Sequence, residues 1–152
     1  MSLEIWYIGK PRHDEFDALS EEYLKRIKKY APIKLSAIKE SKSREPVSKV
    51  RDDSSSLLNL IKPSDFLILL DERGKLFTTI EFADKLRREW MPKRRTIFLI
   101  GGSFGLSEAI RSRANEIIAL SKMVLPHQMA RLVFTEQLYR AFTVLNNENY
   151  HH

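Results

Sequence analysis

Two short apolar runs constrain the fold of this chain more than any other feature. Residues 66–70 read FLILL, and residues 96–100 read TIFLI. A strand covered on both faces, as in a parallel sheet, has such a continuous apolar pattern. A strand with one solvent-exposed face instead alternates apolar and polar residues. Both runs lie between segments with helical periodicity, and strands that alternate with helices indicate an α/β fold. We therefore expect a mostly parallel sheet flanked by helices.

The rest of the chain divides into further segments of these two kinds. Residues 3–8, 33–38 and 117–120 read as strands. Helices are expected where apolar residues recur at three and four positions, over residues 14–30, 47–61, 78–91, 107–115 and 128–145. Thr78 followed by Glu81 is a capping-box pattern that opens the third of these helices. With 152 residues and no repeat or internal linker, we expect a single domain over residues 1–152.

Composition excludes several classes of protein. The chain is 43% hydrophobic and 30% charged, so we expect neither a disordered nor a membrane-embedded protein. The absence of cysteine excludes disulfides, thiolate catalysis and cysteine metal sites, and no secretory signal is visible, so we expect a cytoplasmic protein. The four histidines form no i, i+4 pair beside an acid, so we expect no metal.

The net charge of +6 favours a polyanionic partner such as nucleic acid, although many basic proteins bind none. The basic residues considered for such a surface are Lys10, Arg12, Arg87, Arg88, Lys93, Arg94 and Arg95. Each of them fits a solvated surface position equally well.

Ligands of parallel α/β sheets bind outside the carboxyl ends of the strands, where three loops are expected, at residues 71–75, 101–106 and 121–127. The second loop contains GGSFG at 101–105, and glycine permits positive φ and close approach of a ligand. Its spacing fits neither a dinucleotide-binding fingerprint nor a P-loop. Taken alone, it fits a tight turn that binds nothing equally well. The loop SKMVLPH at 121–127 is suited to hold an adenine through backbone groups, or it is an ordinary connection with a rigid proline.

Several motifs together resemble one family over nearly the whole chain, the RlmH-type ribosomal RNA large-subunit methyltransferases, a small branch of the SPOUT class. The most specific are GGSFGLS at 101–107, LPH at 125–127 and EQLYRA at 136–141, at their mutual spacing. The other positions that carry the resemblance are residues 5–9, 22–26, 69–71, 99–100, 131 and 149–151.

The resemblance implies a SPOUT fold with a carboxy-terminal trefoil knot, a homodimer, and S-adenosylmethionine (SAM) as cofactor. It implies transfer of the SAM methyl group to N3 of a pseudouridine in large-subunit (23S) ribosomal RNA on the assembled ribosome. The cofactor contacts that carry over are Leu70, Gly102, Ser121, Lys122, Met123, Val124, Leu125 and Pro126. The candidate catalytic residues are Arg131, Arg140, Tyr150 and His151.

The carboxy-terminal tail departs from the family pattern. Tails of the family usually end Tyr-His-Arg or Tyr-His-Lys, whereas this chain ends Tyr150-His151-His152. Either His152 supplies part of the missing charge near neutral pH, or the natural end has been altered. Two other functions stay open: a SPOUT enzyme acting on another ribosomal or transfer RNA nucleotide, and a ribosome- or RNA-binding protein without catalysis.

Overall fold

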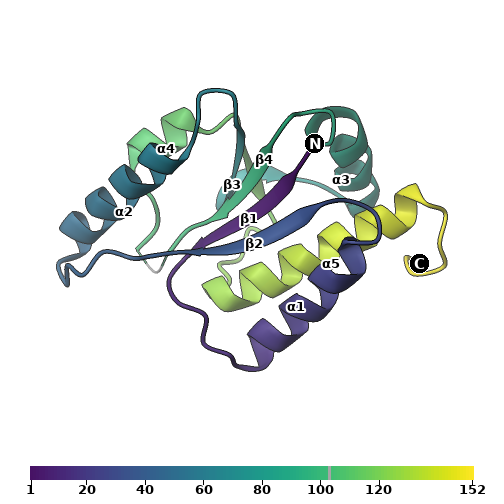
Figure 1. Ribbon diagram of the computed structural model, residues 1–152, viewed down its shortest axis with the longest axis horizontal. Coiled ribbons are helices and arrows are strands. Elements are labelled where there is room, and N and C mark those ends of the chain that lie inside the picture. The colour runs from purple at the N-terminus through teal and green to yellow at the C-terminus, as the bar shows by residue number, and fades with distance from the viewer. Residues whose placement is uncertain (103) are drawn as a thin grey trace.

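A computed structural model describes residues 1–102 and 104–152. Ser103, in the predicted glycine-rich loop, lies outside the described residues. The described residues form a five-stranded, all-parallel sheet in the order β2-β1-β4-β3-β5 (Figure 1). The strands are β1 (Leu3–Ile8), β2 (Ile33–Ile38), β3 (Phe66–Leu76), β4 (Thr96–Ile100) and β5 (Glu116–Ala119). The helices are α1 (Glu15–Ile27), α2 (Pro46–Leu60), α3 (Thr79–Lys85), the π-helical turn η1 (Leu86–Trp90), α4 (Glu108–Arg113) and α5 (His127–Leu145). The predicted α/β class with a parallel sheet is confirmed, whereas the trefoil knot stays a prediction.

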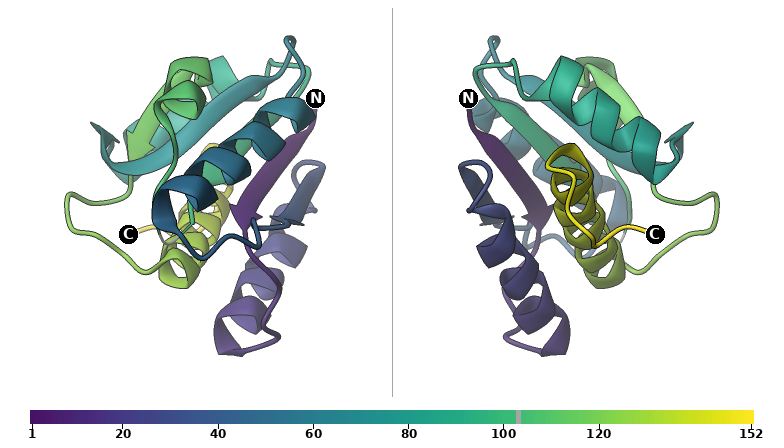
Figure 2. Two further views of the ribbon diagram at one scale, coloured as in Figure 1. Left: turned by 90° about the vertical axis from the view of Figure 1, so that its left-hand side faces the viewer. Right: turned by 90° about the vertical axis from the view of Figure 1, so that its right-hand side faces the viewer.

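Helices cover both faces of the sheet, as Figure 2 shows from two sides. Along β1, the side chains of Ile5 and Tyr7 enter the core under α1, α3 and α5, and those of Trp6 and Ile8 enter the core under α2 and α4. This alternation follows from the two-residue period of a strand. Because both faces are buried, β1, β3 and β4 need apolar residues at successive positions, which explains the runs in the sequence.

Residues 71–75 differ from the prediction of a loop. β3 continues through them and pairs with β5 a second time at Lys75 and Leu76, after an irregularity that begins at Leu70. A Cβ atom at Gly74 would lie 2.6 Å from the backbone carbonyl carbon of Ile118. The strand therefore continues because glycine lets its backbone approach β5 more closely than any side chain would allow.

Local signals explain the helix ends. Thr78 caps α3 as predicted, since its Oγ1 accepts the Glu81 N–H at 3.2 Å and its own N–H donates to Glu81 Oε2 at 2.7 Å. Helix α4 ends before the predicted position 115 because Asn115 hydrogen-bonds with Leu67 of β3 through both its backbone N–H and its side-chain oxygen. Among the described residues, no helix is long and apolar enough to cross a bilayer.

Candidate functional site

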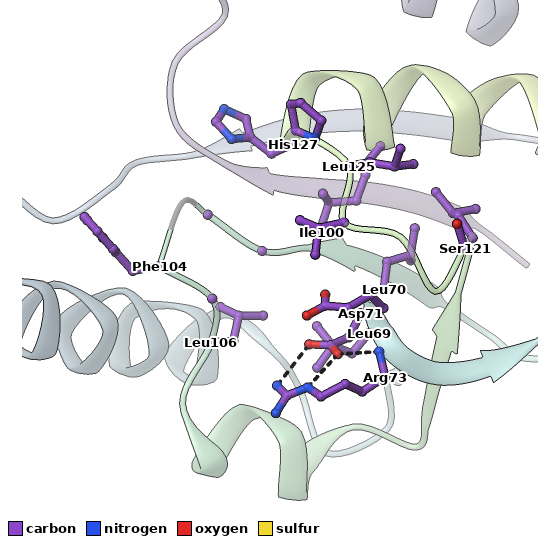
Figure 3. A pocket seen from close by; sticks show the side chains of 18 of the residues that line it. Leu69, Leu70, Asp71, Arg73, Ile100, Phe104, Leu106, Ser121, Leu125 and His127 are labelled. Carbon is purple, nitrogen blue, oxygen red and sulfur yellow. Dashed lines mark hydrogen bonds and ion pairs between the residues drawn. The ribbon is translucent and has the colours of Figure 1, made fainter.

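A cavity of about 720 Å³ opens at the carboxyl ends of β3 and β4 (Figure 3). This volume lies within the range of pockets that hold small molecules and cofactors. Three separate segments meet there because β3 and β4 are neighbours in register, with Leu70 opposite Ile100. They are the end of β3, the glycine-rich loop after β4, and the loop between β5 and α5.

Most of the predicted cofactor residues line this cavity. These are Leu70, Gly102, Ser121, Met123, Val124, Leu125 and Pro126. Lys122 lies on the same loop with an exposed side chain, outside the described lining residues. Met123 and Val124 are 78% and 76% exposed, so the loop presents apolar side chains to its surroundings.

Among the described glycines of this loop, Gly105 alone has a backbone conformation that other residues rarely adopt. Gly105 has a φ of 78°, in the left-handed region, and donates its N–H to the Gly102 carbonyl at 3.0 Å. Gly102 itself does not have a positive φ, and a Cβ there would meet the side chain of Ile8 at an ordinary 3.6 Å. The predicted positive φ is therefore found at Gly105, at the end of the turn. Gly102, at its start, lines the cavity.

The wall of the cavity also holds a charged cluster that the sequence prediction missed. The Asp71 carboxylate forms an ion pair with Arg111, and Oδ1 accepts the Arg73 backbone N–H at 2.9 Å (Figure 3). Burial raises the pKa of Asp71, but hydrogen bonds from Arg73 and Arg111 outweigh this effect and lower the pKa to about 2. The Asp71 carboxylate therefore stays ionised in the cavity wall, with Arg73 and Arg111 of the same wall as its counter-ions. Its position directly after the apolar run 66–70 was the available signal for Asp71, whereas nothing in the sequence marked Arg111.

A second, smaller cavity of about 180 Å³ lies beside the first, and Gly102 and His127 line both. Arg131 lines the smaller one. Its side chain is buried, forms an ion pair with Asp17, and lies with its Cζ 4.1 Å from the centre of the Tyr7 ring.

Burial lowers the pKa of His127, and the charges of Arg12 and Arg131 lower it further, so His127 is neutral at physiological pH.

The other three predicted catalytic residues cluster toward the opposite end of α5. Figure 1 shows that the carboxy terminus lies near this end of the helix. Arg140 donates from Nη2 to Glu136 Oε1 at 2.5 Å, and its Nη1 lies 3.5 Å from His151 Nδ1. The Cζ of Arg140 lies 4.7 Å from the centre of the Tyr150 ring. Nine residues of helix separate Arg140 from Arg131, about 13 Å along the axis. Within one chain, the lining of both cavities, as far as it is described, includes none of these three residues.

The described residues contain no group of three or more His, Asp or Glu side chains arranged to hold a metal ion.

Comparison with known proteins places the chain in a family. It matches the family described as "Predicted SPOUT methyltransferase" over residues 1–151. The "Ribosomal RNA large subunit methyltransferase H" of Parabacteroides distasonis is 40% identical, with 100% of this chain and 99% of the relative aligned. The protein of the same name from Cytophaga hutchinsonii is 41% identical, with both chains aligned over 100% of their length.

A solved structure agrees on the fold. "The structure of a probable methylase family protein from Haemophilus influenzae Rd KW20" has a TM-score of 0.54 at 15% identity, over 95% of this chain and 66% of that one. The match to residues 1–151 and the relatives at about 40% identity support one conclusion. The chain belongs to the SPOUT methyltransferase family.

Proposed function

We propose that this methyltransferase uses SAM to methylate N3 of a pseudouridine in large-subunit (23S) ribosomal RNA on the assembled ribosome, in the cytoplasm. One observation carries the proposal: seven of the eight cofactor positions implied by the family resemblance, from three distant segments, line one cavity. The printed name of the relatives at about 40% identity supports ribosomal RNA as the substrate.

The residues of the larger cavity fit SAM. Apolar side chains of Leu70, Leu125 and Pro126 suit the flat adenine, and Ser121 adds a hydroxyl at the cavity wall. The Asp71 carboxylate, which stays ionised because its pKa is lowered, suits the ribose hydroxyls or the ammonium group of the cofactor. When bound there, SAM supplies the electrophilic methyl group.

The tail cluster has the charges needed to activate the attacking nitrogen. N3 of pseudouridine begins as a weakly acidic imide N–H, so a nearby cation favours the deprotonated ring. The hydrogen bond to Glu136 raises the pKa of Arg140, which stays a cation. Burial and the hydrogen bonds with Tyr23 and Glu136 raise the pKa of Tyr150, so its hydroxyl acts as a donor rather than as a base. His151 is then the group of this cluster suited to accept the proton.

Because this cluster and the larger cavity lie toward opposite ends of α5, we propose that they meet across a homodimer. The tail of one copy would complete the cavity of the other. Three apolar side chains at the cavity, Phe104, Met123 and Val124, are 55%, 78% and 76% exposed, as expected for a surface that a second copy covers. The isolated chain would then hold SAM but lack a complete catalytic site.

The alternative targets are separated by mass spectrometry of modified nucleosides. Deletion of the gene should remove N3-methylpseudouridine from large-subunit RNA, and a plasmid copy should restore it. An unchanged nucleoside in the deletion strain would overturn the assignment, and loss of a different methylated nucleoside would indicate another target. Calorimetric titration with SAM tests the non-catalytic alternative, since a plain RNA-binding protein shows no saturable heat.

A further inference from the structure

The small cavity has the character of an anion site. The charged residues of its lining are Lys10, Arg12, Glu40 and Arg131. Its volume of about 180 Å³ is below the range of sites for whole cofactors, and it is of the size for one small group. Glu40 is the acidic residue of this lining, and its carboxylate is paired with Lys49 at 2.9 Å. Arg131 is likewise paired, with Asp17, so Lys10 and Arg12 carry the net positive charge of the lining.

Arg131 has an unused donor beside this cavity. The residue is 2% exposed, and its guanidinium forms one ion pair, with Asp17. Its Nε is buried and has no hydrogen-bond partner among the described residues. Buried donors are nearly always paired, and this unpaired donor belongs to a residue that lines the cavity, so an acceptor brought by a ligand would complete its hydrogen bonding.

The amino terminus of α5 adds a second donor group. His127 is the first residue of this 19-residue helix, and no described side chain caps the helix at Pro126. The unpaired N–H groups and the dipole at such an end favour phosphate. The amide of Gln128 lines the same space.

The loop that carries Lys10 and Arg12 is fixed to Arg131 through Asp17. Oδ2 of Asp17 accepts the backbone N–H of Arg12 at 2.7 Å and that of His13 at 2.8 Å, while Oδ1 pairs with Arg131. One carboxylate therefore holds the loop and the buried guanidinium together. The backbone of the loop is therefore fixed beside Arg131, and it carries the exposed side chains of Lys10 and Arg12.

We infer that the small cavity binds a backbone phosphate of the RNA substrate, so that the attached nucleotide enters the larger cavity across Gly102 and His127. This inference rests on the proposed function, which supplies the RNA. It gives Arg131 a role in binding the substrate through its phosphate, on the chain that also holds the cofactor.

Uridine 5′-monophosphate and uridine are suitable probes, because they differ by the phosphate alone. The wild-type protein, saturated with SAM, should bind the monophosphate at least tenfold more tightly than the nucleoside, as measured by NMR titration. Lys10→Ala with Arg12→Ala should abolish this preference and leave SAM affinity unchanged. Lys10→Arg with Arg12→Lys keeps the charges and should retain the preference.

Lys28→Ala with Lys29→Ala is the matched control, because it removes the same charge from exposed positions just beyond the carboxy-terminal end of α1, about 20 Å from the start of that helix. This control should keep the preference for the monophosphate. For ribosomal RNA, the slope of log affinity against log salt should become shallower by about 0.7 to 1 per lost phosphate contact in the Lys10 and Arg12 variant only.

Equal affinity of the wild-type protein for the two probes would overturn the inference, and so would an equal loss in the control variant. A protein that methylates RNA without this preference contradicts the phosphate site alone. A protein that shows the preference but transfers no methyl group contradicts the proposed function alone.

Discussion

The hydroxyl of Tyr150 donates a hydrogen bond to Oε1 of Glu136 at 3.1 Å, the carboxylate oxygen that also accepts Arg140 Nη2 at 2.5 Å. A second hydrogen bond, from the Tyr30 hydroxyl to Glu148 Oε1 at 2.7 Å, holds the start of the tail. The tail therefore folds back onto α5 instead of fraying, and its catalytic candidates form one assembled unit.

Glu136→Gln should loosen this unit. The amide keeps the shape of the side chain but removes the charge that anchors Arg140 and Tyr150, and charge-assisted hydrogen bonds are the stronger kind. We expect kcat for methyl transfer to fall about tenfold or more, corresponding to at least 1.4 kcal/mol, with SAM affinity unchanged. Glu89→Gln, which breaks the i,i+4 pair with Lys85, is the control and should retain wild-type kcat. Equal rates for the two variants would contradict this role of Glu136.

Asp71 should make the fold sensitive to acid. The folded protein lowers the pKa of this carboxyl from 3.8 to about 2, so its stabilising effect is complete above about pH 4 and is lost as the pH falls toward 2. Urea unfolding should show a contribution of about 1–2 kcal/mol that disappears over this window and is absent in Asp71→Asn. Asp84→Asn, at an exposed surface pair, should retain the wild-type pH dependence. The same dependence in Asp71→Asn would show that another group causes it.

Gly102 offers a graded test of the larger cavity. A Cβ at this position meets Ile8 at 3.6 Å, so Gly102→Ala should fold and bind SAM almost as the wild type does. Gly102→Val adds two branches beside both cavities and should block SAM binding while leaving the unfolding midpoint nearly unchanged. Calorimetry measures the affinity and circular dichroism the fold. Unaltered affinity in the valine variant would mean that the pocket lies elsewhere.

Gly74→Ala tests the close approach of β3 to β5. The new Cβ would lie 2.6 Å from a backbone carbon of Ile118, so the two strands must separate. We expect a loss of about 1–3 kcal/mol in the free energy of unfolding, the usual cost of overpacking. Glu72→Ala, at an exposed position of the same strand, should cost much less. Similar losses in the two variants would contradict the tight register.

Mixing two inactive variants tests whether two copies share the site. Gly102→Val should disable the cavity, and Arg140→Ala should disable the tail. If each site combines the cavity of one copy with the tail of the other, subunit exchange should restore about a quarter of the wild-type rate, because half of the dimers are mixed and each has one intact site. A mixture as inactive as its components would contradict the shared site.

Much of the fold could be predicted because its signals are local. The bounds of β1, β2 and β4 agree with the predicted ranges. β1 and β4 are buried on both faces and are therefore rich in apolar residues, whereas the partly exposed edge strand β2 has an alternating pattern. The placement of β4 between β1 and β3 could not be predicted, because periodicity describes one strand and not its neighbours. The continuation of β3 through residues 71–75 was missed because those residues are polar, and only Gly74 against Ile118 explains it.

Less of the candidate site than of the fold could be predicted from the sequence. Its cofactor positions came from the family resemblance, and the pairing of Asp71 with Arg111 joins residues 40 positions apart with no shared pattern. Arg131 and Arg140 are nine positions apart, about two and a half turns, so their side chains project from opposite faces of α5. In the structure they have separate partners: Arg131 pairs with Asp17 of α1, and Arg140 pairs with Glu136 of α5 itself.

The most direct test is transfer of a labelled methyl group from SAM to purified ribosomes taken from a strain that lacks the gene. We predict label in one pseudouridine of 23S RNA, approaching one methyl group per ribosome, with far less transfer to naked RNA. The same experiment shows whether the Tyr150-His151-His152 tail supports catalysis. Absence of label in 23S RNA, or label in transfer RNA instead, would contradict the account.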